Sequence, residues 1–454
     1  MILLEQEFDA PTIAGNRGLL GYLRKTAAKR LGEGLVPVRF VITSTTATGY
    51  HCEIGAISGL VEAARSAPRS VFDFSRRAVE NTDHFNVVLL VPTGIGAEIG
   101  GHAGDAAPVT RLLAKTCDTL ITHPNAVNAS DINEIPPNGL YVEGSVICRL
   151  LMGTAGLQPV RSNRVLVVID AHKDELFVNA AINSVSAARA SYGLRCPKVI
   201  QLDPPVKLRA RYTSSGVAAG RVEEFEGLCS VLDEYRDEYD AVAISSVIDV
   251  PHEYHMEYFL SEGKMVNPWG GVEAMLTHAI SSLYDVPSAH SPMLESRAIA
   301  DMDPGVVDPR MAAEAVSITF LQCILKGMQR SPRVVTDAEA MTNASVLTAE
   351  DVSCLVIPDG CLGLPTLAAL GQGIPVIAVR ENRNIMNNDL ASLPWAADQF
   401  YLVENYWEVA GVIAAIRAGV SPESVRRPLH STAVVRKAHS SEVQTSDSPT
   451  IRIA

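Results

Sequence analysis

The stretch of sequence that decides the fold runs from Phe85 to Asn128 and reads FNVVLLVPTGIGAEIGGHAGDAAPVTRLLAKTCDTLITHPNAVN. It begins with an apolar segment, Val87–Val91, without polar alternation, which is typical of a strand buried on both faces of a parallel sheet. A glycine-dense loop follows, then Pro108–Cys117 with helical spacing, then a second predicted strand, Asp118–Thr122. Strand, loop, helix and strand in this order predict an α/β fold.

The loop from Gly94 to Asp105 is the first candidate for a binding site. Such glycine density is costly in chain entropy, so it predicts positive φ angles or close contact with a ligand. Loops after parallel strands are where open sheets bind ligands, and backbone N–H groups ahead of a helix can hold an anion. The alternative is a tight structural crossover with solvated polar side chains. The predicted ligand contacts here are Thr93, Gly94, Gly96, Glu98, Gly100, Gly101 and Asp105.

Three residues are candidates for proton transfer. His102 lies in the glycine loop, His123 follows the second strand, and Glu143 is an acid within an apolar stretch. Histidine changes charge near neutral pH, so His123 suits a general acid or base, although a turn residue held by hydrogen bonds is the simpler reading. Asn125 and Asn128 lie beside His123 and are predicted to fix a ligand carboxylate or amide.

Other loops supply further candidates. The segment Asn267–Glu273 opens a predicted helix, whose N-terminus favours a negative group, so Asn267, Gly270, Gly271 and Glu273 are predicted ligand contacts. Asp359 and Gly360 follow a third apolar strand and are predicted contacts as well. For a metal ion, the spacing of His252 and His255 places both on one helical face, and His172 could add a ligand. A polar surface helix start is the alternative reading.

Composition narrows the class of protein. The chain has 454 residues, of which 47% are hydrophobic and 20% charged, enough for large cores. Its net charge of −13 disfavours nucleic acid, because phosphate binding depends on Lys and Arg. The eight cysteines form no CxxC pair, no apolar run reaches the length of a membrane span, and the N-terminus lacks the features of a signal peptide. We therefore predict a cytoplasmic protein with no membrane partner.

The order of predicted elements divides the chain into four parts. We expect an α/β domain with the glycine loop in residues 1–160, a second α/β domain in 161–335, and an α/β segment in 336–425 that packs with the second domain. Residues 426–454 are predicted to be a disordered tail. The predicted fold is two or three Rossmann-like parallel-sheet domains with a ligand cleft between them.

The segment Ala312–Met328 predicts one long helix that is apolar around nearly its whole circumference. Such a helix is buried on several sides, either in a core or at an interface. Because two-fold dimers are the commonest soluble assembly, we expect a homodimer.

Two resemblances add to this interpretation. The run Val91–Asn128, with its Pro-Thr-Gly-Ile-Gly loop, together with Tyr141–Gly144 and Asp170–His172, resembles an uncharacterised family from bacteria, archaea and photosynthetic organisms, catalogued only as a domain of unknown function. That resemblance covers most of the chain up to about Asn384 and implies no reaction. Separately, the region Pro358–Ile377 looks like the nucleotide-sugar half of two-domain glycosyltransferases and sugar epimerases, with Leu367 in place of their usual acidic residue.

The leading functional hypothesis is an enzyme that acts by acid–base chemistry on a small anionic metabolite, bearing a carboxylate or phosphate, in an interdomain cleft. His102, His123 and Glu143 would transfer protons. The alternatives are a nucleotide-sugar enzyme using Asp359 and Gly360, a metal-dependent hydrolase, and a non-catalytic metabolite sensor. The sequence identifies no cofactor.

Overall fold

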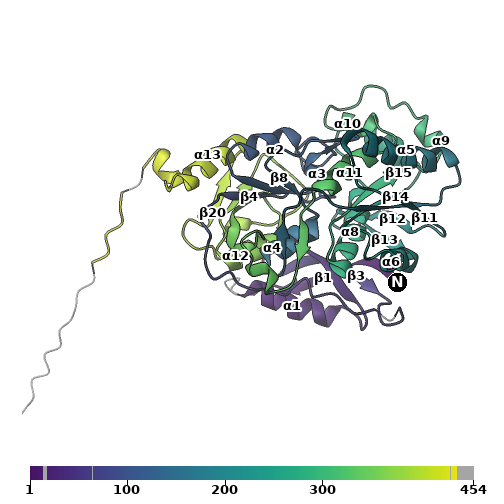
Figure 1. Cartoon of the computed structure of the whole chain (residues 1–454). Coiled ribbons are helices and arrows are strands. Elements are labelled where there is room, and N and C mark those ends of the chain that lie inside the picture. The colour runs from purple at the N-terminus through teal and green to yellow at the C-terminus, as the bar shows by residue number, and fades with distance from the viewer. Residues whose placement is uncertain (14–17, 64, 430, 437–454) are drawn as a thin grey trace, which may run out of the picture.

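The structure is a computed structural model, and it describes every residue except 14–17, 64, 430 and 437–454. It is a mixed α/β protein built around one large curled sheet and one smaller parallel sheet (Figure 1). The α/β class predicted from the sequence is confirmed.

The large sheet combines a parallel half with an antiparallel half. The parallel strands β10, β11, β14 and β15 join the antiparallel ribbon β1–β3–β2 through β12 and β13. In sheet order the strands are β11 (Val199–Leu202), β10 (Val165–Asp170), β14 (Ala241–Asp249), β12 (Lys207–Tyr212), β13 (Ala218–Glu223), β1 (Ile2–Pro11), β3 (Gly49–Ser58), β2 (Val36–Thr45) and β18 (Leu362–Gly363), with β15 (Ser288–Met293) beside β14.

The smaller sheet is parallel throughout. Its order is β20 (Phe400–Val403), β19 (Val376–Val379), β17 (Val352–Pro358), β4 (Asn86–Leu89), β5 (Thr119–Thr122) and β8 (Gly139–Tyr141). The apolar segment read as a doubly buried strand, at β4, is fully buried here, and so is β10 in the large sheet. Two short pairs complete the strands: β9 (Gly156–Gln158) with β16 (Arg333–Val335), and β6 (Asn128–Ala129) with β7 (Ile132–Asn133).

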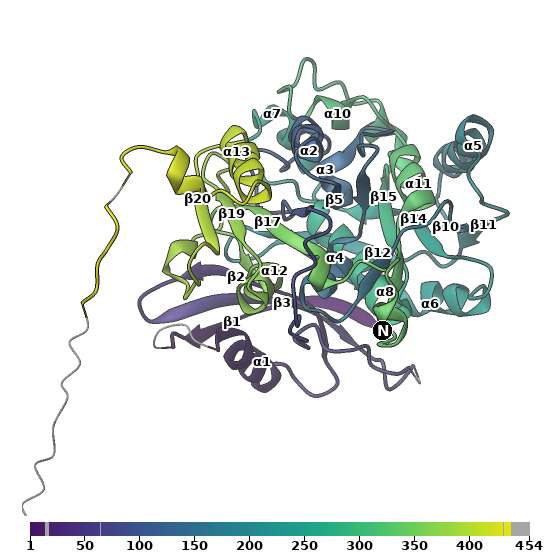
Figure 2. The same ribbon diagram turned by 60° about the vertical axis from the view of Figure 1, so that its left-hand side comes forward.

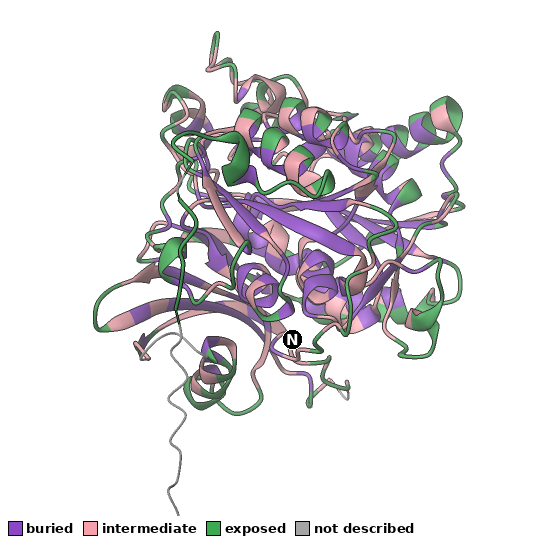
Figure 3. Cartoon of the chain, turned by 90° about the vertical axis from the view of Figure 1, so that its left-hand side faces the viewer, coloured by how far each residue is buried: buried purple, intermediate pink, exposed green. Residues whose placement is uncertain are grey.

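Helices separate and cover the sheets. Figure 2 shows α1 below the β1–β3 ribbon, α4, α8 and α12 above that ribbon, and α2 and α13 on the far side of the parallel sheet. Figure 3 shows that the strands between these layers are buried, while the outer helices expose one face. The helices are α1 (Leu19–Arg30), α2 (Ala107–Ala114), α3 (Pro124–Val127), α4 (Gly144–Leu151), α5 (Glu175–Tyr192), α6 (Phe225–Glu234), α7 (Tyr254–Leu260), α8 (Gly270–Tyr284), α9 (Arg297–Ala300), α10 (Ala312–Ala315), α11 (Leu321–Arg330), α12 (Leu364–Gln372) and α13 (Tyr406–Arg417).

Strand pairing crosses the predicted domain boundaries. β4, β5 and β8 come from the part predicted as 1–160, yet they share a sheet with β17, β19 and β20 from 336–425. The large sheet likewise joins β1–β3 to strands from 161–335. The division into domains therefore stays a prediction. Most of the predicted tail, residues 437–454, lies outside the described residues.

The single long helix predicted for Ala312–Met328 is wrong. The chain forms α10 and then breaks before α11, with Phe320 at φ 46°. The break is set by Asp131, whose carboxylate accepts hydrogen bonds from the hydroxyls of Ser317 and Thr319 and from the N–H of Gln322 at the start of α11. One face of α11 lies in a core cluster of this chain, so the predicted helix no longer argues for a dimer.

A substitution at Gly271 tests how closely α8 packs on the large sheet. A Cβ at Gly271 would lie 2.0 Å from the carbonyl oxygen of Ala218, whereas a Cβ at Gly411 in α13 would meet nothing within 4 Å. We expect Gly271→Ala to lower the free energy of unfolding by about 1–3 kcal/mol. Gly411→Ala should raise it by about 0.4–1 kcal/mol, because alanine restricts the unfolded chain. Urea denaturation measures both, and equal effects would contradict the packing.

Candidate functional site

A cavity of about 450 Å³ lies among the elements that the sequence predicted to form a site. Its lining includes Thr93 after β4, His123 and Asn125 after β5, Glu143 ahead of α4, and Asn267 ahead of α8. Residues that are far apart in the sequence thus meet at the carboxyl ends of parallel strands, as open sheets favour.

One face of helix α8 forms a wall of the cavity. The lining positions Gly270, Glu273, Ala274, Thr277 and His278 recur at the three- and four-residue spacing of one helical face. The opposite face of the same helix contributes to the core against the large sheet. The helix therefore fixes a carboxylate and an imidazole at the cavity wall.

The central feature of the cavity is a pair formed by Glu143 and His278. One carboxylate oxygen of Glu143 contacts Nδ1 of His278 in a short hydrogen bond, and the other accepts from the Ser145 hydroxyl and from the N–H groups of Ser145 and Val146. Glu143 is 2% exposed. Burial opposes its ionisation, but His278 and the hydrogen bonds from Ser145 outweigh burial and lower the pKa of Glu143.

The pair leaves one nitrogen of His278 for a ligand. An ionised Glu143 accepts the proton on Nδ1, so Nε2 of a neutral imidazole carries the lone pair. Within the described part of the chain, no hydrogen bond engages Nε2, and the His278 side chain, which lines the cavity, is 17% exposed. This is the arrangement of a positioned general base.

His123 has the same tautomer as His278, but the protein engages its other nitrogen, Nε2. The N–H of Val91 donates to Nε2 of His123 at 3.0 Å, so the proton of the neutral ring is on Nδ1. Burial lowers the pKa of His123 to about 4, and the charge of Glu143 only partly offsets this. His123 is therefore neutral at physiological pH, and its geometry suits a hydrogen-bond donor better than the predicted acid or base.

A second carboxylate–imidazole pair faces the same cavity. His290 on β15 contacts Glu273 through Nδ1 at 2.8 Å and the Ser246 hydroxyl through Nε2 at 2.7 Å. Glu273 and His290 line the cavity, whereas Ser246 is fully buried in β14. The chain of contacts fixes the position of one oxygen of the Glu273 carboxylate.

The glycine loop is engaged mainly with the protein itself. The N–H groups of Glu98, Ile99 and Gly100 donate to Arg383, Asn382 and Asp105 respectively, and that of Ala103 donates to Glu314. Gly94, Gly96, Gly100 and Gly104 have positive φ angles, and a Cβ at each would contact protein atoms. Local conformation and packing account for these glycines, so the anion cradle stays a prediction.

His102 lies behind the cavity wall. Its Nδ1 is 2.6 Å from the hydroxyl of Tyr258, and burial lowers the pKa of His102 to about 4. Nearby, burial raises the pKa of Glu314 to about 7 and that of Asp105 to about 7. Of these groups Glu314 lines the cavity, where it accepts hydrogen bonds from Ala103 and Asn267.

The three asparagines that the sequence predicted as ligand contacts all line the cavity, but their side chains already form hydrogen bonds within the protein. Asn125 donates to the carbonyl of Gly100, and Asn128 donates to the hydroxyl of Tyr141. The side-chain oxygen of Asn267 accepts from Trp269 and Gly270 and so caps α8. They hold the walls in place.

The remaining residues that the sequence predicted as ligand contacts or metal ligands do not form one cluster. Asp359 and Gly360 follow β17, where Gly360 has φ 83° and its N–H donates to the Asp359 carboxylate. His252 and His255 have ring centroids 6.4 Å apart, while His172 contacts the backbone of Asp174 and Glu295. In the described residues, no three His, Cys, Asp or Glu side chains come together as a metal site.

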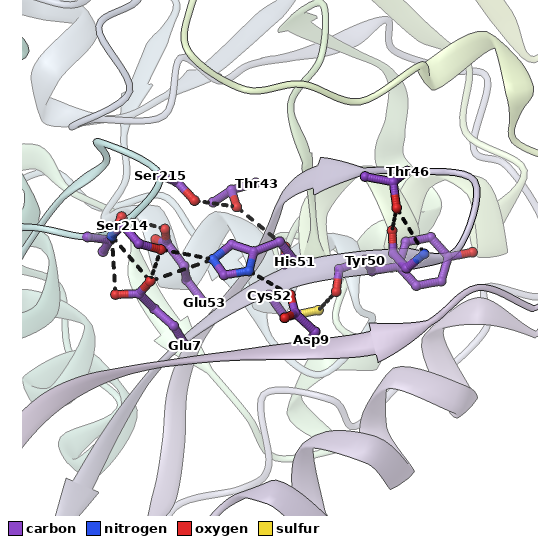
Figure 4. Close-up of polar contacts among 12 residues, drawn as sticks. Glu7, Asp9, Thr43, Thr46, Tyr50, His51, Cys52, Glu53, Ser214 and Ser215 are labelled. Carbon is purple, nitrogen blue, oxygen red and sulfur yellow. Dashed lines mark hydrogen bonds and ion pairs between the residues drawn. The ribbon is translucent and has the colours of Figure 1, made fainter.

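A second polar cluster lies on the β1–β3 ribbon (Figure 4). Asp9 contacts Nδ1 of His51 at 2.8 Å, and Nε2 of His51 lies 3.4 Å from the hydroxyl of Ser214. The order resembles a catalytic triad, but the Ser214 hydroxyl and N–H both donate to Glu7. Asp9 is 84% exposed. This serine is tied to a carboxylate, so the cluster links β1, β3 and the β12–β13 turn.

Asp170 is a buried carboxyl group that lies outside the cavity. Asp170 ends β10 and is 2% exposed, and neither oxygen has a hydrogen-bond partner of good geometry in the described residues. Burial raises its pKa to about 7, which the Val206 backbone offsets only in part. An uncompensated buried carboxyl group favours its neutral form.

Sequence reasoning missed His278, His290 and Ser246. Each lies in a segment without a motif, and its partner comes from another helix, strand or loop: Glu143 is 135 residues from His278. The only local signal was the helical spacing of Glu273, Thr277 and His278 along α8.

Comparison with known proteins places the chain in a family. A family described as "Protein of unknown function (DUF3326)" matches residues 86–426, and the chain belongs to it. A similar protein is named "Uncharacterized lipoprotein" in Synechococcus sp.; it is 33% identical over 341 residues, which cover 74% of this chain and 92% of that protein. No solved structure matches the chain. The resemblance to an uncharacterised family is confirmed.

The comparison also corrects two predictions. A lipoprotein is attached to a membrane, so the name of the cyanobacterial relative contradicts a cytoplasmic location and the exclusion of a membrane partner. The predicted set of partners, homodimer included, is withdrawn with them. In the described residues, no helix is both long and apolar enough to cross a bilayer.

The raised pKa of Asp170 can be tested through the pH dependence of stability. Its folded pKa of about 7 exceeds the unfolded value of 3.8, so its ionisation destabilises the fold as pH rises between these values. Asp170→Asn, which mimics the neutral acid, should raise the free energy of unfolding by about 2 kcal/mol at a pH of about 8 and have no such effect at a pH of about 3.5. Urea denaturation at several pH values measures this.

Asp174 is the matched control with the opposite sign. It is partly exposed, and Arg297 lowers its pKa to about 2. Asp174→Asn should therefore lose a little stability at neutral pH. A gain from Asp170→Asn that does not change with pH would refute a raised pKa.

Proposed function

We propose that this protein is an enzyme that performs acid–base chemistry on a small organic substrate in the cavity. The observation that carries the proposal is the Glu143–His278 pair. It combines a buried, ionised carboxylate with an imidazole that lines a cavity of about 450 Å³ and has no hydrogen bond at Nε2 within the described residues. Pockets of this size accommodate metabolites, and carboxylate–histidine pairs recur as general bases.

Each group has a distinct role in this proposal. Glu143 holds the Nδ1 proton, so His278 accepts a substrate proton at Nε2, and the carboxylate stabilises the imidazolium that forms. His123, with its proton on Nδ1, donates a hydrogen bond to a substrate oxygen that gains negative charge. The imidazolium of His278 returns the proton to the product, and Glu273, held by His290, lines the same cavity.

The substrate was predicted to be an anion bound between two Rossmann-like units. The parallel strands that meet at the cavity support that architecture. The guanidinium groups of Arg39 and Arg149 line the cavity and could attract an anion, but they already pair with Glu5 and Asp285. The proposal therefore rests on proton transfer more than on anion capture.

The proposal of a membrane location rests only on the name of the cyanobacterial relative. The cyanobacterial protein is named a lipoprotein, and we extend to this chain the proposal that it works at or near a membrane. A non-catalytic sensor is the second candidate, favoured by the occupied asparagines and loop amides, which hold the walls in one conformation.

Replacing His278 tests the proposal directly. We expect His278→Gln to lower turnover by about 10²-fold or more, because the base is lost while the helix face is kept. Purified wild-type protein is incubated with a metabolite extract, and mass spectrometry identifies the compounds that are consumed and formed. The same reactions are then followed with the variant.

The exposed His84 supplies the control variant. His84→Gln should retain the activity of the wild type, and thermal melts should show that both variants are folded. If the wild type binds a compound without converting it, the sensor is favoured. Equal conversion by wild type and His278→Gln would refute the role of His278.

A further inference from the structure

The cavity has an apolar wall that acid–base chemistry alone does not explain. Beyond the polar groups on α8, its lining continues onto α7 and onto the chain between β15 and α11. The large apolar side chains there are Met256, Phe259, Met293, Leu294, Ile299, Met302, Ile318 and Phe320.

This apolar wall reaches the surface of the protein. Ile318 lines the cavity and is also 51% exposed, so one side chain belongs to both. Val316, two residues before Ile318 on the same segment, is 77% exposed. Contiguous exposed apolar groups at the edge of a cavity are typical of a site that receives an apolar ligand.

The conformation that presents Ile318 and Phe320 is specifically stabilised. Phe320 has φ 46°, a left-handed conformation that is costly for a bulky residue. Asp131 maintains it by accepting hydrogen bonds from Ser317, Thr319 and Gln322. A strained residue held at a cavity wall is a typical feature of ligand contacts.

From these observations we propose that the substrate is an amphiphile, with a polar head at His278 and an apolar tail along the wall formed by α7 and residues 293–320. The position of the polar head at His278 rests on the proposed function. The tail leaves the cavity past Ile318, so its outer end is exposed to solvent or to a lipid surface. Burial of apolar area provides the affinity for the tail.

A homologous series of alcohols tests the tail directly. Isothermal titration calorimetry of the wild-type protein with n-butanol, n-hexanol, n-octanol and n-decanol, each below its solubility limit, should show affinity rising by up to about fourfold per added methylene. Ile318→Ser should lower the affinity for the longest alcohols by about tenfold.

Val306→Ser is the matched control, since Val306 is exposed on the same segment but lies outside the cavity lining. It should bind like the wild type. Should Ile318→Ser melt at a lower temperature than the wild type, Met302→Ser tests the same wall. An affinity independent of chain length, or equal losses in the Ile318 and Val306 variants, overturns the proposal.

His278→Gln separates this proposal from the proposed function. It should keep the dependence on chain length, because the tail contacts other residues. If the series binds as predicted but His278→Gln still converts substrate like the wild type, the amphiphile site stands and the base is wrong. If His278→Gln is inactive but chain length has no effect, the base stands and the tail site is wrong.

Discussion

The rest of the site depends on the carboxylate of Glu143. A charge buried to 2% exposure is tolerated only when several partners replace water. Glu143 has them in Ser145, Val146 and His278, so it caps α4 and at the same time joins α4 to α8. Since α4 follows the parallel sheet and α8 packs on the large sheet, one ionised group ties the two sheets together at the cavity.

The sequence predicted those parts of the fold that local pattern controls. A continuous apolar run identified β4, and the loops after β4 and β5 that the sequence singled out line one cavity with residues of the segment Asn267–Glu273. The break between α10 and α11 could not be predicted, because Asp131 causes it from nearly two hundred residues away. His278 was missed for the same reason: its partner Glu143 comes from another layer of the structure.

The glycine loop shows how one pattern can have two causes. Its glycines were expected to approach a ligand, and several do approach other atoms, but these belong to Val91, Ala129 and Ala218 of the same chain. The loop thereby brings Thr93 and Ala103 to the cavity wall, while its amides are bound by Asp105, Asn382 and Glu314. Its contribution is to build the wall, whereas the groups to which we assign the proposed chemistry lie on α8 and before α4.

The most direct test of the central claim is the tautomer of His278, measured by NMR of protein with nitrogen-15-labelled histidine. The account predicts a hydrogen-bonded proton on Nδ1 of His278 that disappears in Glu143→Gln, while the signals of the exposed His84 stay unchanged. It also predicts that His123 carries its proton on Nδ1 and remains neutral until the pH approaches about 4. A His278 spectrum unaffected by Glu143→Gln would contradict the pairing on which the site is built.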